Sequence, residues 1–85
     1  MRQLSDELRA RVAETRVNLL SDGRHVTYDN RVSQKVCAEI LACPESRLAR
    51  WRAEGKGPRH VRLGKGCWYP LADLLEWIDN NDVFA

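Results

Sequence analysis

Residues 33–55 read SQKVCAEILACPESRLARWRAEG, and this stretch decides the fold. Ser33 is a good helix N-cap because its hydroxyl can accept a hydrogen bond from a backbone N–H in the first turn. The apolar residues after it recur at helical spacing and predict one buried stripe on a helix over 33–42: Val36, Cys37, Ile40 and Leu41. Pro44 cannot continue that helix, but it suits the first position of a new one.

The second helix of this stretch is expected to begin at Pro44 and to run to about Glu54, before Gly55. Its only large apolar residues, Leu48 and Trp51, are three positions apart, so both must point inward. The residues that then point away from the body are small or basic: Ser46, Ala49, Arg50 and Ala53. Two short helices joined by a tight turn, the second basic on its outer side, describe a helix-turn-helix.

The residues after this pair of helices predict a β-hairpin and a last helix. Val61 and Leu63 alternate with polar residues, the segment 64–66 (Gly-Lys-Gly) turns the chain, and residues 67–69 return it. Lys65 is therefore exposed at the hairpin tip, where it can meet a phosphate or the minor groove of DNA. Pro70 then opens a helix to about Asp79 with an apolar side: Leu71, Leu74, Leu75, Trp77 and Ile78.

The N-terminal part predicts one more helix over residues 5–22, with Ser5 as its N-cap and Gly23 as its stop. After it, residues 24–31 are rich in turn-forming residues. Within them Val26 and Tyr28 alternate with polar residues, which predicts a short strand.

These elements predict a mainly α fold with a small β-hairpin, arranged as a winged helix-turn-helix with an extra N-terminal helix. We divide the chain into an N-terminal helical arm (1–27), a winged helix-turn-helix DNA-binding domain (28–79) and a C-terminal tail (80–85). The length of 85 residues fits one small domain with an arm.

Charge is segregated along the chain, although its net value is only +2. Residues 32–69 hold eight Lys or Arg and three Glu, whereas residues 70–85 hold four acidic residues and no Lys or Arg. A basic middle on an otherwise balanced body indicates that the middle meets a polyanion.

Several classes of protein are excluded by what the sequence lacks. It has no run of 18 apolar residues and no apolar signal-peptide core near its start, so we expect neither a membrane span nor a signal peptide. Three cysteines without a C-x-x-C pair indicate reduced thiols in a cytoplasm. The cysteines and histidines lack zinc-ligand spacing, and no catalytic arrangement or phosphate-binding loop is present. We therefore expect no metal, no cofactor and no enzyme activity.

A family resemblance covers residues 28–79 and rests on motifs in a fixed order. These are Leu and Trp three apart (Leu48, Trp51), a helix-closing Gly55, Pro58 before the hairpin, RLGKG at its tip (62–66), and an aromatic residue followed by Asp-Leu-x-x-Trp (Tyr69, Asp73, Leu74, Trp77). In these features the chain resembles the MerR-like winged-helix domains of small excisionases and AlpA-like phage or prophage regulators.

The resemblance implies a sequence-specific DNA-binding protein of a phage or mobile element. It would act as an excisionase (a recombination directionality factor), as a transcriptional regulator, or as both. The implied partners are double-stranded DNA, an integrase and further copies of the chain on adjacent sites, at a cytoplasmic, nucleoid-associated location and with no role for a membrane.

The expected DNA contacts fall into three groups. The recognition helix supplies Ser46, Arg47 and Arg50. Phosphate contacts come from Ser33, Gln34, Lys35 and Arg52. The wing supplies Arg59, His60, Arg62 and Lys65.

A different class stays open from the sequence. In a protein-interaction or adaptor module, like the one in small terminase subunits, the N-terminal helix would be the working surface and the basic side would only aid solubility. Nucleic-acid affinity that falls steeply with salt discriminates between the two readings.

Overall fold

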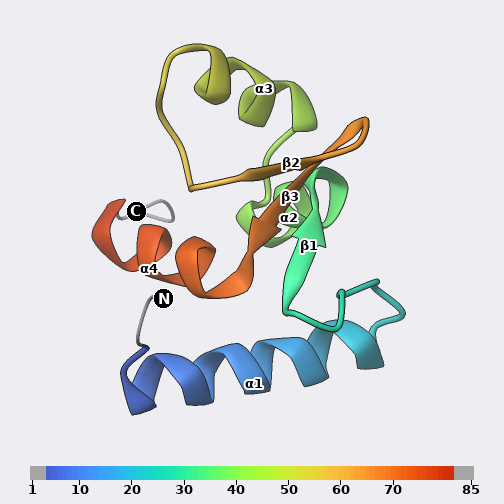
Figure 1. Ribbon diagram of the computed structural model, residues 1–85, viewed down its shortest axis with the longest axis vertical. Coiled ribbons are helices and arrows are strands. Elements are labelled where there is room, and N and C mark those ends of the chain that lie inside the picture. Colours follow the sequence, from blue (N-terminus) through green and yellow to red (C-terminus); the bar gives the residue numbers. More distant parts are fainter. Residues whose placement is uncertain (1–3, 82–85) are drawn as a thin grey trace.

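Four helices and a three-stranded antiparallel sheet make up residues 4–81, the part of the chain that the computed structural model describes (Figure 1). Their order along the chain is α1 (Asp6–Ser21), β1 (Arg31–Ser33), α2 (Gln34–Leu41), α3 (Glu45–Ala53), β2 (Val61–Leu63), β3 (Gly66–Pro70) and α4 (Leu71–Asn81). The expectation of a mainly helical fold with a small hairpin is confirmed at this level.

The helices begin where the capping residues predict. The Ser5 hydroxyl accepts a hydrogen bond from the Leu8 N–H at 3.1 Å, and the Ser33 hydroxyl accepts one from the Val36 N–H at 3.3 Å. Helix α2 ends at Leu41, and its C-cap residue, Ala42, has a φ of 53° in the left-handed region. Pro44 is the N-cap of α3 and not its first residue, because its ψ of 149° is extended.

The sheet has the order β1-β3-β2, with β3 in the centre. Val32 of β1 is opposite Tyr69, and Arg62 of β2 is opposite Cys67. The strand predicted over residues 24–31 is wrong except for its last residue. Asn30 has a φ of 63°, so the chain turns just before β1 begins at Arg31.

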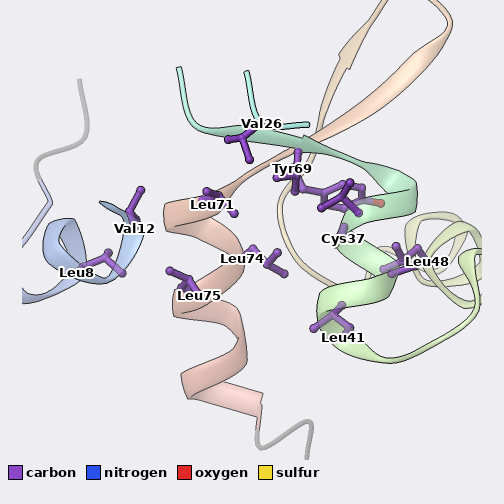
Figure 2. Packing of buried hydrophobic residues seen from close by; sticks show 13 residues of the cluster. Leu8, Val12, Val26, Cys37, Leu41, Leu48, Tyr69, Leu71, Leu74 and Leu75 are labelled. Atoms are coloured by element: carbon purple, nitrogen blue, oxygen red, sulfur yellow. The ribbon is translucent and has the colours of Figure 1, made fainter. Parts of the chain in front are cut away.

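One hydrophobic core joins the sheet to α2, α3 and α4 (Figure 2). Its most deeply buried side chains are less than 2% exposed and come from all of these elements: Tyr69, Leu48, Leu71, Leu74, Val32 and Cys37. Leu48 thus points inward from α3 as predicted, so the opposite side of that helix faces outward.

Helix α1 packs against α4, at the opposite end of the molecule from α3 (Figure 1). Leu8 and Val12 enter the core, and an ion pair joins Arg11 to Asp79 at the surface. Arg16 Nη1 donates to the Thr27 carbonyl oxygen at 2.5 Å, which fixes the loop that follows α1. Helix α1, in the predicted arm, therefore contributes to the packing of the core. Deletion of the arm is the test of the proposed boundary after residue 27. Of the predicted tail, residues 82–85 lie outside the described residues.

Candidate nucleic-acid interface

An open groove of about 370 Å³ lies between the start of α2, the two ends of α3 and the β2–β3 hairpin. We call it the cationic groove, because four basic side chains and one carboxylate line it: Lys35, Arg52, Arg62, Lys65 and Glu45. Ser33 and Gln34 also line it. The fold therefore brings together six of the predicted DNA-contact residues, from segments up to 32 positions apart.

The turn at the hairpin tip depends on the backbone conformation of a glycine. Gly64 has a φ of 61°, which residues other than glycine rarely adopt, and Lys65 is the second residue of the two-residue turn between Leu63 and Gly66. A glycine at the first central position is what a type II′ hairpin turn requires. This turn exposes Lys65 at the edge of the cationic groove.

Arg52 is tied to two other elements by its guanidinium. Its Nη1 donates to Gln34 Oε1 at 2.5 Å and to Tyr69 Oη at 2.8 Å. Gln34 Nε2 in turn reaches Glu45 Oε1 at 3.5 Å. These bonds connect the start of α2, both ends of α3 and the central strand β3. The sequence predicted Arg52 as a phosphate contact and gave no sign of its bond to Tyr69, 17 residues away.

Tyr69 is buried in the core, and only 1% of its surface is exposed. Burial raises the pKa of its phenol above the ordinary value, although the hydrogen bond from Arg52 acts in the opposite direction. The phenol is therefore neutral at physiological pH and gives Arg52 an uncharged acceptor.

The outer side of α3 presents the residues predicted for base recognition. Ser46, Arg47 and Arg50 are all exposed, and with Pro44 they line a second hollow of about 280 Å³. We call these three residues the outer face of α3. Glu45, at the first turn of the same helix, lines the cationic groove, so the two features adjoin at the N-terminal end of α3.

Two predicted wing residues lie elsewhere. Arg59 and His60 precede β2, at the end of that strand away from the hairpin tip, and neither lines the cationic groove. Both are exposed, and the His60 ring centroid is 6.1 Å from that of Tyr69. The structure thus brings Arg62 and Lys65 to the groove and leaves Arg59 and His60 outside it.

All three cysteines are free thiols, and Cys37 is the one buried in the core. Burial, and then the nearby Cys43, raise the pKa of the Cys37 thiol to about 12. Burial also raises the pKa of Cys43, and this outweighs the opposite effect of Arg47. Within residues 4–81 no group of three or more His, Cys, Asp or Glu side chains is arranged to hold a metal ion.

Comparison with family models, with curated proteins and with solved structures gives no match. In the same described part of the chain, no helix has the length and apolar character to cross a membrane.

Proposed function

We propose that the chain is a winged helix-turn-helix protein that binds double-stranded DNA, without catalysis. Helix α3 enters the major groove, and the β2–β3 hairpin is the wing that meets phosphate or the adjacent minor groove. The observation that carries the proposal is the cationic groove beside the outer face of α3. Four basic side chains from three separate segments converge there on one open hollow.

Helix α3 suits the major groove for steric reasons. The groove admits one helix, and the small exposed residues Ala49 and Ala53 let the backbone of α3 approach the bases closely. Arg47 and Arg50 can then reach guanine edges, where a guanidinium forms paired hydrogen bonds. The inward side of the helix is occupied by Leu48, so the orientation of α3 is fixed by the core.

The distribution of charge supports the same orientation on DNA. Helix α4 carries Asp73, Glu76 and Asp79 and no basic residue, and none of its residues lines the cationic groove. Phosphates would repel this acidic side and attract the cationic groove.

For the biological role, we propose action at DNA of a phage or other mobile element, as an excisionase, a transcriptional regulator or both. The family resemblance supports this role, which carries with it a nucleoid-associated location in the cytoplasm. Binding next to a recombination attachment site would favour excision, and binding at a promoter would favour regulation. Footprinting on the DNA that flanks the gene separates these two outcomes.

The experiment that tests DNA recognition is selection from a pool of random duplexes, followed by affinity measurement on the selected sequence and on an unselected duplex. Arg50→Ala is expected to lose about 1–3 kcal/mol of binding free energy on the selected sequence and much less on the unselected one. Arg9→Ala is the matched control, because Arg9 is an exposed arginine of α1, far from α3. Equal losses on both duplexes would assign Arg50 to phosphate, and no loss would remove α3 from the groove.

The interaction-module alternative has one observation in its favour. Val17 and Leu20 of α1 are 61% and 47% exposed, and Tyr28 in the following loop is 94% exposed. Exposed apolar side chains can dock on another protein where they form a contiguous patch. Wild-type protein that enriches no sequence and shows no salt-dependent binding to any duplex would overturn the DNA-binding proposal and leave this alternative.

A further inference from the structure

We propose that Tyr69 is a positioning residue that holds Arg52 ready for one backbone phosphate in the cationic groove. The inference rests on the proposed function, since the phosphate belongs to the DNA. Tyr69 itself does not touch the ligand: its ring is buried in the core, and only its hydroxyl reaches Arg52, at 2.8 Å.

The chemistry of the partners is the first argument. Arg52 is held by a phenol oxygen and an amide oxygen, at 2.8 Å and 2.5 Å, and both acceptors are neutral. A carboxylate in the same position would fix the guanidinium equally well but would cancel its charge. Neutral acceptors fix the direction of the side chain and leave its full positive charge for an anion.

The donors that Arg52 keeps free are the second argument. A guanidinium has five N–H donors, and Nη1 makes both of the hydrogen bonds that Arg52 forms with other described residues. The donors on Nε and Nη2 are therefore left for a ligand. Two such donors suit a phosphate, which arginine binds in a bidentate manner.

The surroundings are the third argument. Arg52 lines the cationic groove together with Lys35, Arg62 and Lys65, and these four basic side chains outweigh the single Glu45 carboxylate there. The free donors of Arg52 therefore lie in a site of net positive charge. Arginine is a flexible side chain, and ordering it on binding costs free energy. Because the bonds to Tyr69 and Gln34 order it beforehand, that cost is removed from the binding step.

The test is a double-mutant cycle on DNA affinity. The variants are Tyr69→Phe, which removes only the hydroxyl, Arg52→Ala, and the two together. The probe is a labelled duplex of random sequence, because phosphate contacts do not depend on base sequence. Affinity is measured by fluorescence anisotropy at several salt concentrations, and thermal unfolding is recorded for each variant. Tyr28→Phe is the matched control, since it removes a hydroxyl from an exposed tyrosine outside the groove.

Tyr69→Phe is expected to weaken binding by about two- to tenfold, the loss that corresponds to ordering one long side chain. The slope of log K against log salt should stay unchanged, because Arg52 still reaches the phosphate. Arg52→Ala should make the slope shallower by about 0.9, the effect of one phosphate contact. In the Arg52→Ala background, Tyr69→Phe should have no further effect on affinity, and Tyr28→Phe should match the wild type throughout.

Two results would overturn the inference while leaving DNA binding intact. One is wild-type affinity for Tyr69→Phe. The other is the same loss from Tyr69→Phe with and without Arg52, which would assign Tyr69 a purely structural role in the hairpin. If the wild-type protein itself shows no salt-dependent binding to the duplex, the proposed function fails and the inference falls with it.

Discussion

Gly57 lies directly against the indole of Trp51. A Cβ added at Gly57 would stand 3.1 Å from Trp51 Cβ and 3.3 Å from Trp51 Cε3, which is closer than side chains normally pack. Gly57 also has a φ of +88°, in the region that favours glycine. The Trp51 ring also packs against the Trp77 ring of α4, with ring centroids 5.3 Å apart. Trp51 therefore links the loop after α3 to α4.

Gly57→Ala is expected to lower the free energy of unfolding by about 2–3 kcal/mol. About 1–2 kcal/mol comes from forcing alanine into a positive φ, and the rest comes from crowding against Trp51. The measurement is urea denaturation. Gly55→Ala is the matched control, because Gly55 has a φ of +72° with nothing within 4 Å of the added Cβ. Equal losses in the two variants would show that the contact with Trp51 contributes nothing.

Leu8 tests whether the N-terminal arm stabilises the domain. Leu8→Ala is expected to cost about 2 kcal/mol of unfolding free energy, because Leu8 packs in the core between α1 and α4. Val17→Ala, on the exposed side of the same helix, should stay within about 0.5 kcal/mol of the wild type. Denaturation curves give both values, and no loss from Leu8→Ala would mean that α1 only rests on the surface.

Deletion of residues 1–23 tests the proposed domain boundary. We expect the remaining chain to keep a cooperative unfolding transition, because α2, α3, α4 and the sheet share most of the core. The midpoint of the unfolding transition should fall, because the deletion removes Leu8 and Val12 from the core. Loss of all cooperativity would make α1 an integral part of the domain and move the boundary to the start of the chain.

Capping residues and helical periodicity predicted the helices well, because these signals are local. Ser5 and Ser33 accept the expected N–H bonds, and Leu48 points inward. The strand before α2 was misplaced because its signal is a single buried residue, Val32. The alternation of Val26 and Tyr28 was misleading: Val26 is buried by packing, whereas Tyr28 is almost fully exposed in a turn.

The candidate site was predicted in composition but not in geometry. Basic residues from α2, α3 and the hairpin were expected to act together, and those of the cationic groove do lie together. The bond from Arg52 to Tyr69 and the close approach of Gly57 to Trp51 depend on how distant elements pack. Neither leaves a periodic or local signal in the sequence, so only the three-dimensional structure reveals them.

The buried thiol of Cys37 predicts a loss of stability in alkaline solution. Burial raises its pKa from 9.0 to about 12, so the folded protein keeps the thiol proton at a pH where the unfolded chain releases it. The free energy of unfolding should therefore fall as pH rises above 9, by up to about 1.4 kcal/mol per pH unit for this group. Denaturation curves at several pH values measure the fall.

Cys37→Ala provides the comparison for that measurement. It should lose about 1 kcal/mol at neutral pH from the small cavity, yet show a shallower alkaline decline than the wild type. Tyr69 and Cys43, whose pKa values are also raised, are present in both proteins, so the difference between the two curves reports Cys37 together with its electrostatic coupling to these two groups. An equally steep alkaline decline in the two proteins would show that the Cys37 thiol does not cause the loss of stability.

Lys65 at the hairpin tip gives the most direct test of the wing. Lys65→Ala should leave the free energy of unfolding within about 0.5 kcal/mol of the wild type, because the side chain is exposed. If the tip contacts one phosphate, the slope of log K against log salt should become shallower by about 0.9. The measurement is a salt titration of both proteins on one duplex, with Arg9→Ala as a charge-matched control that keeps the wild-type slope. A loss on all sequences alike would assign Lys65 to phosphate, whereas a loss confined to A·T-rich flanks would assign it to a narrow minor groove. An unchanged slope with unchanged affinity would mean that the hairpin tip does not touch DNA, and the interaction-module alternative would gain support.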